Sequence, residues 1–150
     1  MKLIFILILF LFPLYLFLIA PRMRKKADRT PFLNFHYAHR GLFDNTSDAP
    51  ENSLLAFQKA VDAGYGIELD VQLSKDNQLV IFHDSTLKRM CGAEGHVWDY
   101  TLEELQQMKL ADSDQTIPAF QDFLKVVNGK VPFILEYKLD RPQTKVCKLA

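Results

Sequence analysis

The sequence predicts an α/β fold in which a mainly parallel sheet is covered by helices. Between residues 34 and 138, short apolar runs typical of strands alternate with stretches of helical periodicity. The 150 residues suffice for a domain with a core, and the apolar fraction of 49% and charged fraction of 24% are ordinary for a globular protein. The net charge is zero, and no basic face interleaved with aromatic residues indicates nucleic-acid binding.

The first part of this region predicts three strands and one helix. Residues 34–39 form a short aromatic-rich run that stops at a glycine-containing loop, as a strand does. Residues 53–63 place apolar side chains at helical spacing. Residues 66–74, "GIELDVQLS", alternate strictly between apolar and polar, and a tight polar turn leads to the next strand in residues 77–84, "NQLVIFHD".

The second part predicts two helices and a further strand. Thr101 and Glu104 form a Thr-x-x-Glu capping box, which is typical of a helix N-terminus. Residues 117–130, "IPAFQDFLKVVNGK", again show helical periodicity, and residues 131–138, "VPFILEYK", form an apolar strand. This alternating order of strands and helices predicts the mainly parallel sheet.

Residues 1–20 predict a transmembrane anchor. Residues 3–20 are apolar throughout except for the phenol of Tyr15, and at a helical rise they cover most of a hydrocarbon core. A cleaved signal peptide is the alternative, but the apolar run is long and Leu18 stands where a small residue is preferred for cleavage. We therefore expect an uncleaved single-pass anchor in the cell membrane, joined to the rest of the chain by a basic linker of residues 21–33.

Positive charges flank this anchor on its C-terminal side. They are Arg22, Arg24, Lys25 and Lys26, and they outweigh Lys2 and the terminal amine. Because positive flanks stay in the cytoplasm, residues 21–150 are expected on the cytoplasmic side.

Three carboxylates lie on predicted strands. Glu68 and Asp70 share the polar face of one strand, and their alternation alone fits either a solvated face or a metal site. Glu136 lies among apolar residues in a run that predicts burial, and a buried carboxylate must be paired or coordinated. Lys138 follows on the same face, either as a structural ion-pair partner or as part of a site at the strand end.

Two histidines are predicted at strand ends. His39 ends the first strand and His83 the third, and this placement matches that of the carboxylates. Parallel barrels carry their chemistry at the C-terminal ends of strands. The set therefore predicts a metal-assisted acid–base site rather than unrelated polar residues.

Several separated motifs resemble the glycerophosphodiester phosphodiesterases. They are "AHRG", "PENSLLAFQKAVDAGYGIELDVQLSKDNQLVIFHD", "IPAFQDFL" and "FILEYK", and the resemblance runs from residue 36 to the C-terminal end. It implies a TIM (β/α)8 barrel, a divalent cation, and hydrolysis of glycerophosphodiesters to glycerol 3-phosphate and an alcohol. Only about the first half of such a barrel is expected in residues 34–150, because four strand candidates are present where eight are needed.

The resemblance also implies a role for each site residue. His39 and His83 would form the acid–base pair, and the metal ligands would be Glu68, Asp70 and Glu136. The phosphate would be bound by Arg40 and Lys138, with Glu51 as a supporting residue. Three carboxylates without thiolates suit Mg²⁺ or Ca²⁺ rather than zinc.

Two other functions fit the same residues. A lysophospholipase D that acts on membrane lipids is one, and the expected membrane anchor favours it mildly. A non-catalytic membrane-bound barrel is the other, although a binding module has no need of an acid–base pair. Because half a barrel leaves an open sheet edge, we expect residues 1–150 alone to be poorly soluble and to have little activity.

Overall fold

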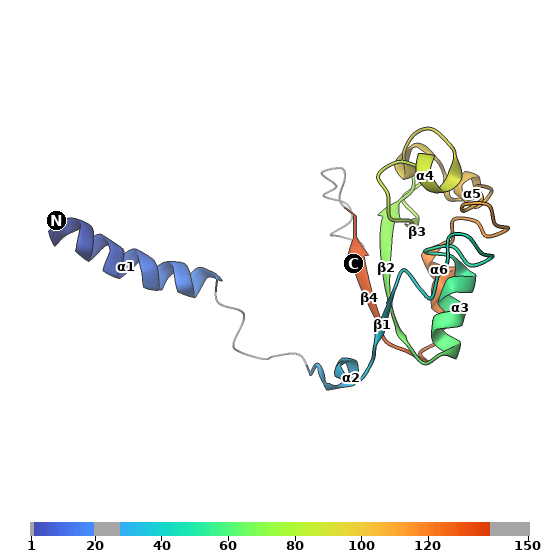
Figure 1. The fold of residues 1–150 in the computed structure, drawn as a ribbon. Helices are drawn as coiled ribbons and strands as arrows, with labels where there is room; N and C mark the ends of the chain where they lie inside the picture. The colour runs from blue at the N-terminus through green and yellow to red at the C-terminus, as the bar shows by residue number, and fades with distance from the viewer. Residues whose placement is uncertain (1, 20–27, 139–150) are drawn as a thin grey trace. The chain divides into compact units, whose positions relative to one another are not determined.

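The computed structural model describes residues 2–19 and 28–138, and the chain divides into two units, Met1–Leu33 and Asn34–Ala150. In the first unit, Lys2–Ile19 form helix α1 and Thr30–Leu33 form the single-turn helix α2 (Figure 1). No helix within the described ranges is long and apolar enough to cross a membrane. The predicted transmembrane helix is therefore not confirmed.

The predicted linker of residues 21–33 is described only in its second part, because residues 20–27 lie outside the described residues. This second part is not irregular throughout, since it contains α2. The carboxylate of Asp28 accepts a hydrogen bond of 2.9 Å from the backbone N–H of Thr30 at the start of that helix. The location in the cell membrane and the cytoplasmic orientation stay predictions.

A four-stranded sheet forms the centre of the second unit within the described residues. Its longest strand, β2 (Gly66–Leu73), pairs in parallel with β1 (Tyr37–His39) and with β4 (Phe133–Tyr137). Strand β3 (Leu79–Ile81) pairs antiparallel with the end of β2. The predicted mainly parallel sheet is thus confirmed by β1 and β4. Strand β3 was counted among the parallel strands of the expected barrel and is instead antiparallel, because a tight turn can join only antiparallel neighbours.

Two helices cover one face of the sheet (Figure 1). They are α3 (Leu54–Asp62) and α6 (Phe120–Val127), close to the predicted bounds. Phe57 and Phe123 are fully buried between the helices and the sheet, with ring centroids 4.9 Å apart in an edge-to-face arrangement. The apolar residues of β2, such as Ile67, belong to the same core. This packing leaves the alternate side chains of β2 and β4 on the opposite face.

Short helices between β3 and α6 form a second core. They are α4 (Lys88–Cys91), the 3-10 helix η1 (Val97–Asp99) and α5 (Leu102–Leu105). The predicted capping box is present at the start of α5. That helix is shorter than its sequence pattern indicates, because the chain turns after Leu105 to reach a β-bridge between Lys109 and Thr116.

Candidate functional site

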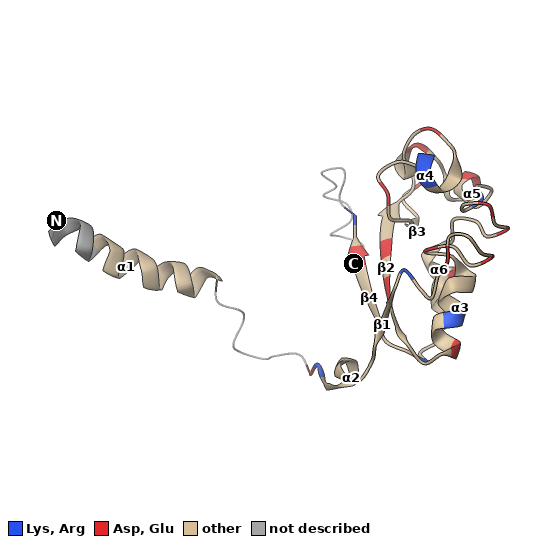
Figure 2. Ribbon diagram, viewed as in Figure 1, with Lys and Arg blue, Asp and Glu red and all other residues tan. Residues whose placement is uncertain are grey.

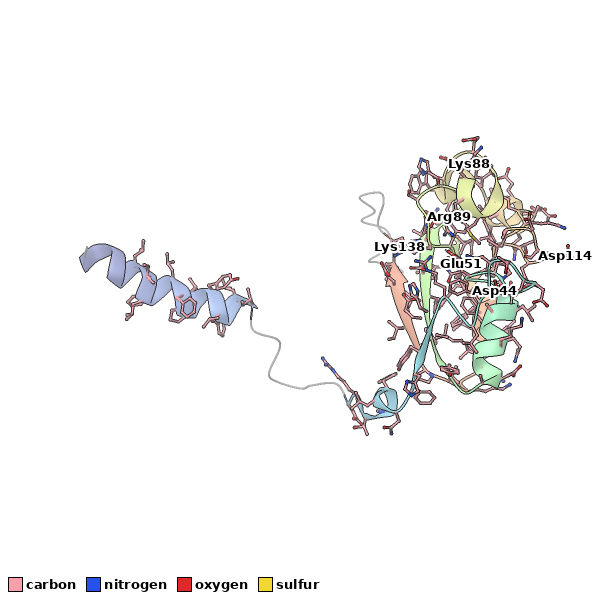
Figure 3. All side chains as sticks on the ribbon, viewed as in Figure 1. Asp44, Glu51, Lys88, Arg89, Asp114 and Lys138 are labelled. Atoms are coloured by element: carbon pink, nitrogen blue, oxygen red, sulfur yellow. The ribbon has the colours of Figure 1, made fainter. Side chains whose placement is uncertain are left out.

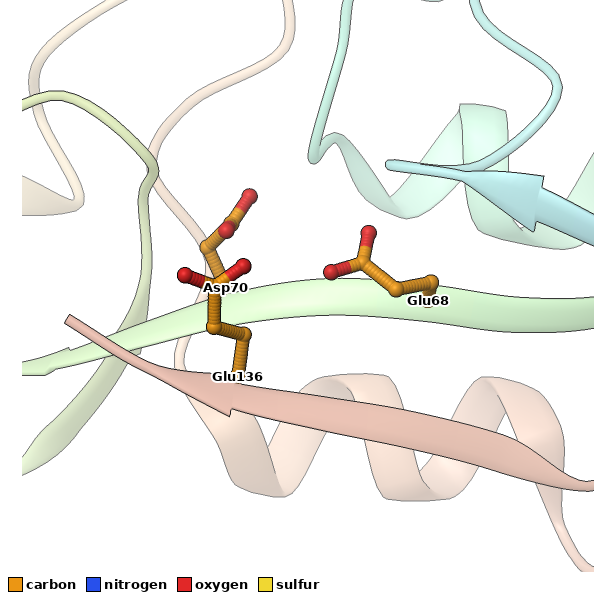
Figure 4. Close-up of side chains that lie close together, drawn as sticks. All are labelled: Glu68, Asp70 and Glu136. Carbon is orange, nitrogen blue, oxygen red and sulfur yellow. The ribbon is translucent and has the colours of Figure 1, made fainter.

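Two neighbouring parallel strands bring three carboxylates together. In the register of β2 and β4, Glu68 is opposite Ile134 and Asp70 is opposite Glu136, so these side chains share one face of the sheet. One oxygen from each carboxylate lies within 4.8 Å of the others. Figure 4 shows the three side chains gathered on one side of the strands, and Figure 2 shows acidic positions within β2 and near the C-terminal end of β4.

The three carboxylates differ in burial. The side chain of Asp70 is fully buried and that of Glu68 is 18% exposed, but that of Glu136 is 51% exposed. The predicted burial of Glu136 is therefore wrong. Strand alternation explains the error: Leu135 and Tyr137 pack on the core, and Glu136 between them faces the other way.

The two β2 carboxylates fit a divalent cation. Oε2 of Glu68 and Oδ1 of Asp70 are buried and accept no hydrogen bond from the described residues. Burial raises the pKa of Glu68, and the charges of Asp70 and Glu136 raise it further despite the opposing effect of His39. Buried carboxylate oxygens that lack donors are costly unless a cation binds them, and Mg²⁺ and Ca²⁺ prefer oxygen ligands.

Two basic side chains flank Asp70. Nε of Arg40 lies 3.5 Å from Oδ2 of Asp70. Nζ of Lys138 lies 3.1 Å from Oδ1 of Asp70, which is an ion-pair distance without hydrogen-bond geometry, and it donates to Oε1 of Glu136 at 2.5 Å. Burial alone would lower the pKa of Lys138, but the carboxylates of Glu136 and Asp70 outweigh it and raise that pKa. Lys138 is therefore charged, and both basic side chains lie next to the carboxylate cluster.

A strained turn positions Arg40. Its φ is 61°, in the left-handed region, and its backbone N–H donates to the carbonyl of Glu68 at 2.8 Å. Gly41 follows with a φ of 88°, and a Cβ there would lie 2.9 Å from the backbone of Ala56 in α3. The chain thus turns tightly against α3 directly after β1. A left-handed non-glycine residue costs of order 1–3 kcal/mol and is often found at functional sites.

The two predicted histidines lie on different segments near this cluster. Nε2 of His39 is 3.7 Å from Oε2 of Glu68, and the side chain is 65% exposed. His83 follows β3 by two residues instead of ending it, so its predicted placement at a strand end is wrong. The antiparallel hairpin returns the chain to the level of Asp70, whose carbonyl accepts from the N–H of Phe82 at 3.0 Å. His83 and Lys138 line the same open pocket.

A neighbouring carboxylate determines the proton position on His83. Nδ1 of His83 lies 2.8 Å from Oδ1 of Asp84. A hydrogen bond from Arg89, followed by those from His83, outweighs burial and lowers the pKa of Asp84 to about 2. The ionised carboxylate only accepts hydrogen bonds, so Nδ1 carries the proton and Nε2 of neutral His83 is free to accept one.

Glu51, predicted as a supporting residue, is buried at the centre of a partly exposed hydrogen-bond network. It accepts hydrogen bonds from Nη1 of Arg40 at 2.8 Å, from Nδ2 of Asn45 at 2.9 Å, and from Arg89. Burial alone would raise the pKa of Glu51. The hydrogen bonds from Arg89, Asn45 and Arg40, together with the positive charge of Arg89, outweigh burial and lower this pKa to about 2. Asn52, with a left-handed φ of 58°, donates to Oδ2 of Asp70 at 3.1 Å.

Sequence reasoning did not identify Asp84, Arg89 or Asn52 as parts of the site. Their contacts join residues up to 38 positions apart, and no local pattern reveals such pairs. The one available signal was the pair of adjacent polar residues in "HD", which places Asp84 beside a candidate acid–base histidine.

Comparison with known proteins identifies the family. The family model described as the glycerophosphoryl diester phosphodiesterase family matches residues 39–149, which include every predicted site residue. A glycerophosphodiester phosphodiesterase from Caldanaerobacter subterraneus subsp. tengcongensis is 49% identical over an aligned length of 100 residues, and the match covers 62% of this chain and 40% of that protein. A lysophospholipase D from Rattus norvegicus is 37% identical over 92 residues, 61% of this chain and 28% of that protein.

A solved structure extends the comparison to the fold. A phosphodiesterase from Oleispira antarctica, in complex with the product sn-glycerol-3-phosphate, matches with a TM-score of 0.63 and 33% identity. The match covers 71% of this chain and 45% of that chain. This chain spans less than half the length of the curated relatives it matches. By the extent of these matches, the chain belongs to the glycerophosphoryl diester phosphodiesterase family.

Proposed function

We propose that the protein hydrolyses glycerophosphodiesters to glycerol 3-phosphate and an alcohol, with the help of a divalent cation. The observation that carries the proposal is the convergence of three carboxylates with Arg40 and Lys138 beside two histidines. The relative with bound sn-glycerol-3-phosphate supports a substrate of this class.

The basic side chains would bind the substrate's phosphate. A phosphodiester is a monoanion, and negative charge builds on its non-bridging oxygens during attack. Arg40 and Lys138 would neutralise this charge, and Lys138 lies in the pocket that His83 also lines. Glu68, Asp70 and Glu136 would hold the cation, Mg²⁺ or Ca²⁺, which when bound supplies further positive charge at these oxygens.

The two histidines would transfer the protons. Asp84 keeps a proton on Nδ1 of His83, so that Nε2 can accept a proton from the nucleophile or, once protonated, return it. His39 is exposed and lies near Glu68, where it can carry out the other of the two proton transfers. One histidine would take the proton of the nucleophile and the other would protonate the leaving alkoxide.

A lysophospholipase D activity is the second candidate. The lysophospholipase D from Rattus norvegicus favours it, because that protein is 37% identical to this chain over 92 residues. Both reactions cleave a phosphodiester on a glycerol backbone, so the polar residues described above serve either one. The difference lies in whether the glycerol carries an acyl chain.

One assay separates these functions. Two proteins are compared: the full chain, and a fusion of this chain with the remaining strands of a curated relative's barrel, which we call the joined protein. Each is incubated with Mg²⁺ and either glycerophosphocholine or lysophosphatidylcholine. We expect glycerol 3-phosphate from the first substrate, at least from the joined protein. Release of lysophosphatidic acid from the second substrate alone would favour the lysophospholipase D function, and cleavage of neither substrate would contradict both.

A further inference from the structure

Arg89 links the carboxylates of Asp84 and Glu51, which belong to different parts of the site. Figure 3 labels Arg89 and Glu51 close to each other. Its Nε donates to Oδ2 of Asp84 at 2.6 Å, and its Nη2 donates to Oδ1 of the same carboxylate at 2.8 Å. Nη2 also donates to Oε1 of Glu51 at 2.6 Å, and Nη1 donates to Oε2 at 3.1 Å. The planar guanidinium therefore makes a two-bond contact with each acid.

On one side, this contact restrains His83 through Asp84. Oδ1 of Asp84 accepts from both His83 and Arg89, and Oδ2 accepts from Arg89. With both oxygens held, the carboxylate cannot rotate away from the imidazole. The carbonyl of Asp84 is held as well, because it accepts from Nε2 of Gln72 at 2.8 Å.

On the other side, the contact restrains Arg40 through Glu51. Oε1 of Glu51 accepts from Nη1 of Arg40 at 2.8 Å, on the same oxygen that accepts from Arg89. Arg40 in turn approaches Asp70. One guanidinium thus connects the His83 segment with the Arg40 turn, which otherwise lie on separate loops.

We propose that Arg89 is a positioning residue that holds His83 through Asp84 and Arg40 through Glu51, and so keeps the proton-transfer group and the phosphate-binding group at a fixed spacing. That this spacing matters for turnover rests on the proposed function. The side chain of Arg89 is 47% exposed, but its two acidic partners are 6% and 20% exposed, so Arg89 fixes their geometry as well as stabilising their charged forms. A lysine keeps the charge but not the planar fork, and it cannot make both two-bond contacts.

The first test measures the proton position on His83 without any substrate. The full chain is labelled with ¹⁵N at histidine, and His83 is assigned with a His83→Gln variant. At about pH 8.5, where imidazole is neutral, the nitrogen shifts report which nitrogen carries the proton. We expect the Nδ1–H form in the wild type and a shift toward the Nε2–H form in Arg89→Gln and Arg89→Lys, as in an Asp84→Ala reference.

The neighbouring residue on α4 supplies the control. Lys88 pairs only with the exposed Glu94 among the contacts described, so Lys88→Gln changes the same helix and one positive charge without touching Asp84. In Lys88→Gln, His83 should keep the Nδ1–H form of the wild type. An unchanged His83 in folded Arg89→Lys would overturn the proposal, and this milder variant decides the question if Arg89→Gln does not fold.

The second test measures turnover. In the joined protein, Arg89→Lys should lower kcat for glycerophosphocholine by about tenfold or more, since misplacement by about 1 Å has large effects on rate. Loss of turnover only through a higher KM, with kcat unchanged, would count against positioning of His83. If the wild type does not cleave diesters but the nitrogen shifts behave as expected, the proposed function fails while the structural link through Arg89 stands.

Discussion

Replacing Glu51 by glutamine should destabilise the fold in a pH-dependent way. The side chain is 6% exposed and interacts with two arginines, and its pKa falls from an ordinary 4.5 to about 2 on folding. Each pKa unit corresponds to about 1.4 kcal/mol, so the ionised carboxylate contributes about 3 kcal/mol to the free energy of unfolding at pH 7. Glu51→Gln should lose about this amount, because the amide also places donors against the guanidinium groups.

The sign of the pH dependence follows from the lowered pKa. A carboxyl whose pKa is lower in the folded state stabilises the fold above its unfolded pKa, and this stabilisation is lost as the pH falls through the folded pKa. The difference between wild type and Glu51→Gln should therefore be largest above about pH 5 and should shrink between about pH 4.5 and pH 2.

Urea unfolding of both proteins at pH 7, 4 and 2.5 measures this difference directly. Comparing the two proteins at each pH removes the contribution of Asp84, whose pKa is lowered to about 2 in the same way. Glu94→Gln is the control, because its exposed pair with Lys88 should contribute little at any pH. A loss of the same size at pH 7 and pH 2.5, or a loss below about 1 kcal/mol at pH 7, would refute the reasoning.

Three further changes have defined outcomes. Gly41→Ala should destabilise the fold by about 1–3 kcal/mol in urea unfolding, and by clearly more than Gly129→Ala. Both glycines have a positive φ, but only Gly41 lies against the backbone of another segment, at Ala56. Equal losses of stability would mean that this close approach contributes nothing. Asp70→Asn should weaken Mg²⁺ or Ca²⁺ binding by about tenfold or more in calorimetric titration, and unchanged affinity would exclude this carboxylate as a ligand. His39→Ala and His83→Ala should each lower the rate of the joined protein by about 100-fold, with the double variant little worse, whereas additive losses would count against a pair acting in one turnover.

Much of the sheet could be predicted from the sequence because strand alternation is a local property. The pattern in residues 66–73 assigned Glu68 and Asp70 to one face, and the structure places them there. Helix α3 was equally clear, because its apolar spacing and the Ser53 side chain at its N-terminus both act within a few residues. These elements need no knowledge of distant contacts.

Two of the errors overlooked a local rule, and one omission depends on tertiary contacts. Glu136 has apolar neighbours in the sequence, but alternation turns it away from the core they form. Strand β3 was counted toward the eight parallel strands of a barrel, although the tight turn before it is too short for a parallel crossover. Arg89 lies on a four-residue helix with no motif of its own, and its importance depends on two acids that only folding brings to it.

The most direct test of the central claim is the metal dependence of glycerol 3-phosphate release. The joined protein is assayed with glycerophosphocholine before and after treatment with EDTA, and again after Mg²⁺ or Ca²⁺ is added back. If Glu68, Asp70 and Glu136 hold the cation that the reaction needs, release stops in the chelator and returns with the metal, and the Asp70→Asn variant does not recover. Full activity in the presence of EDTA would contradict the account.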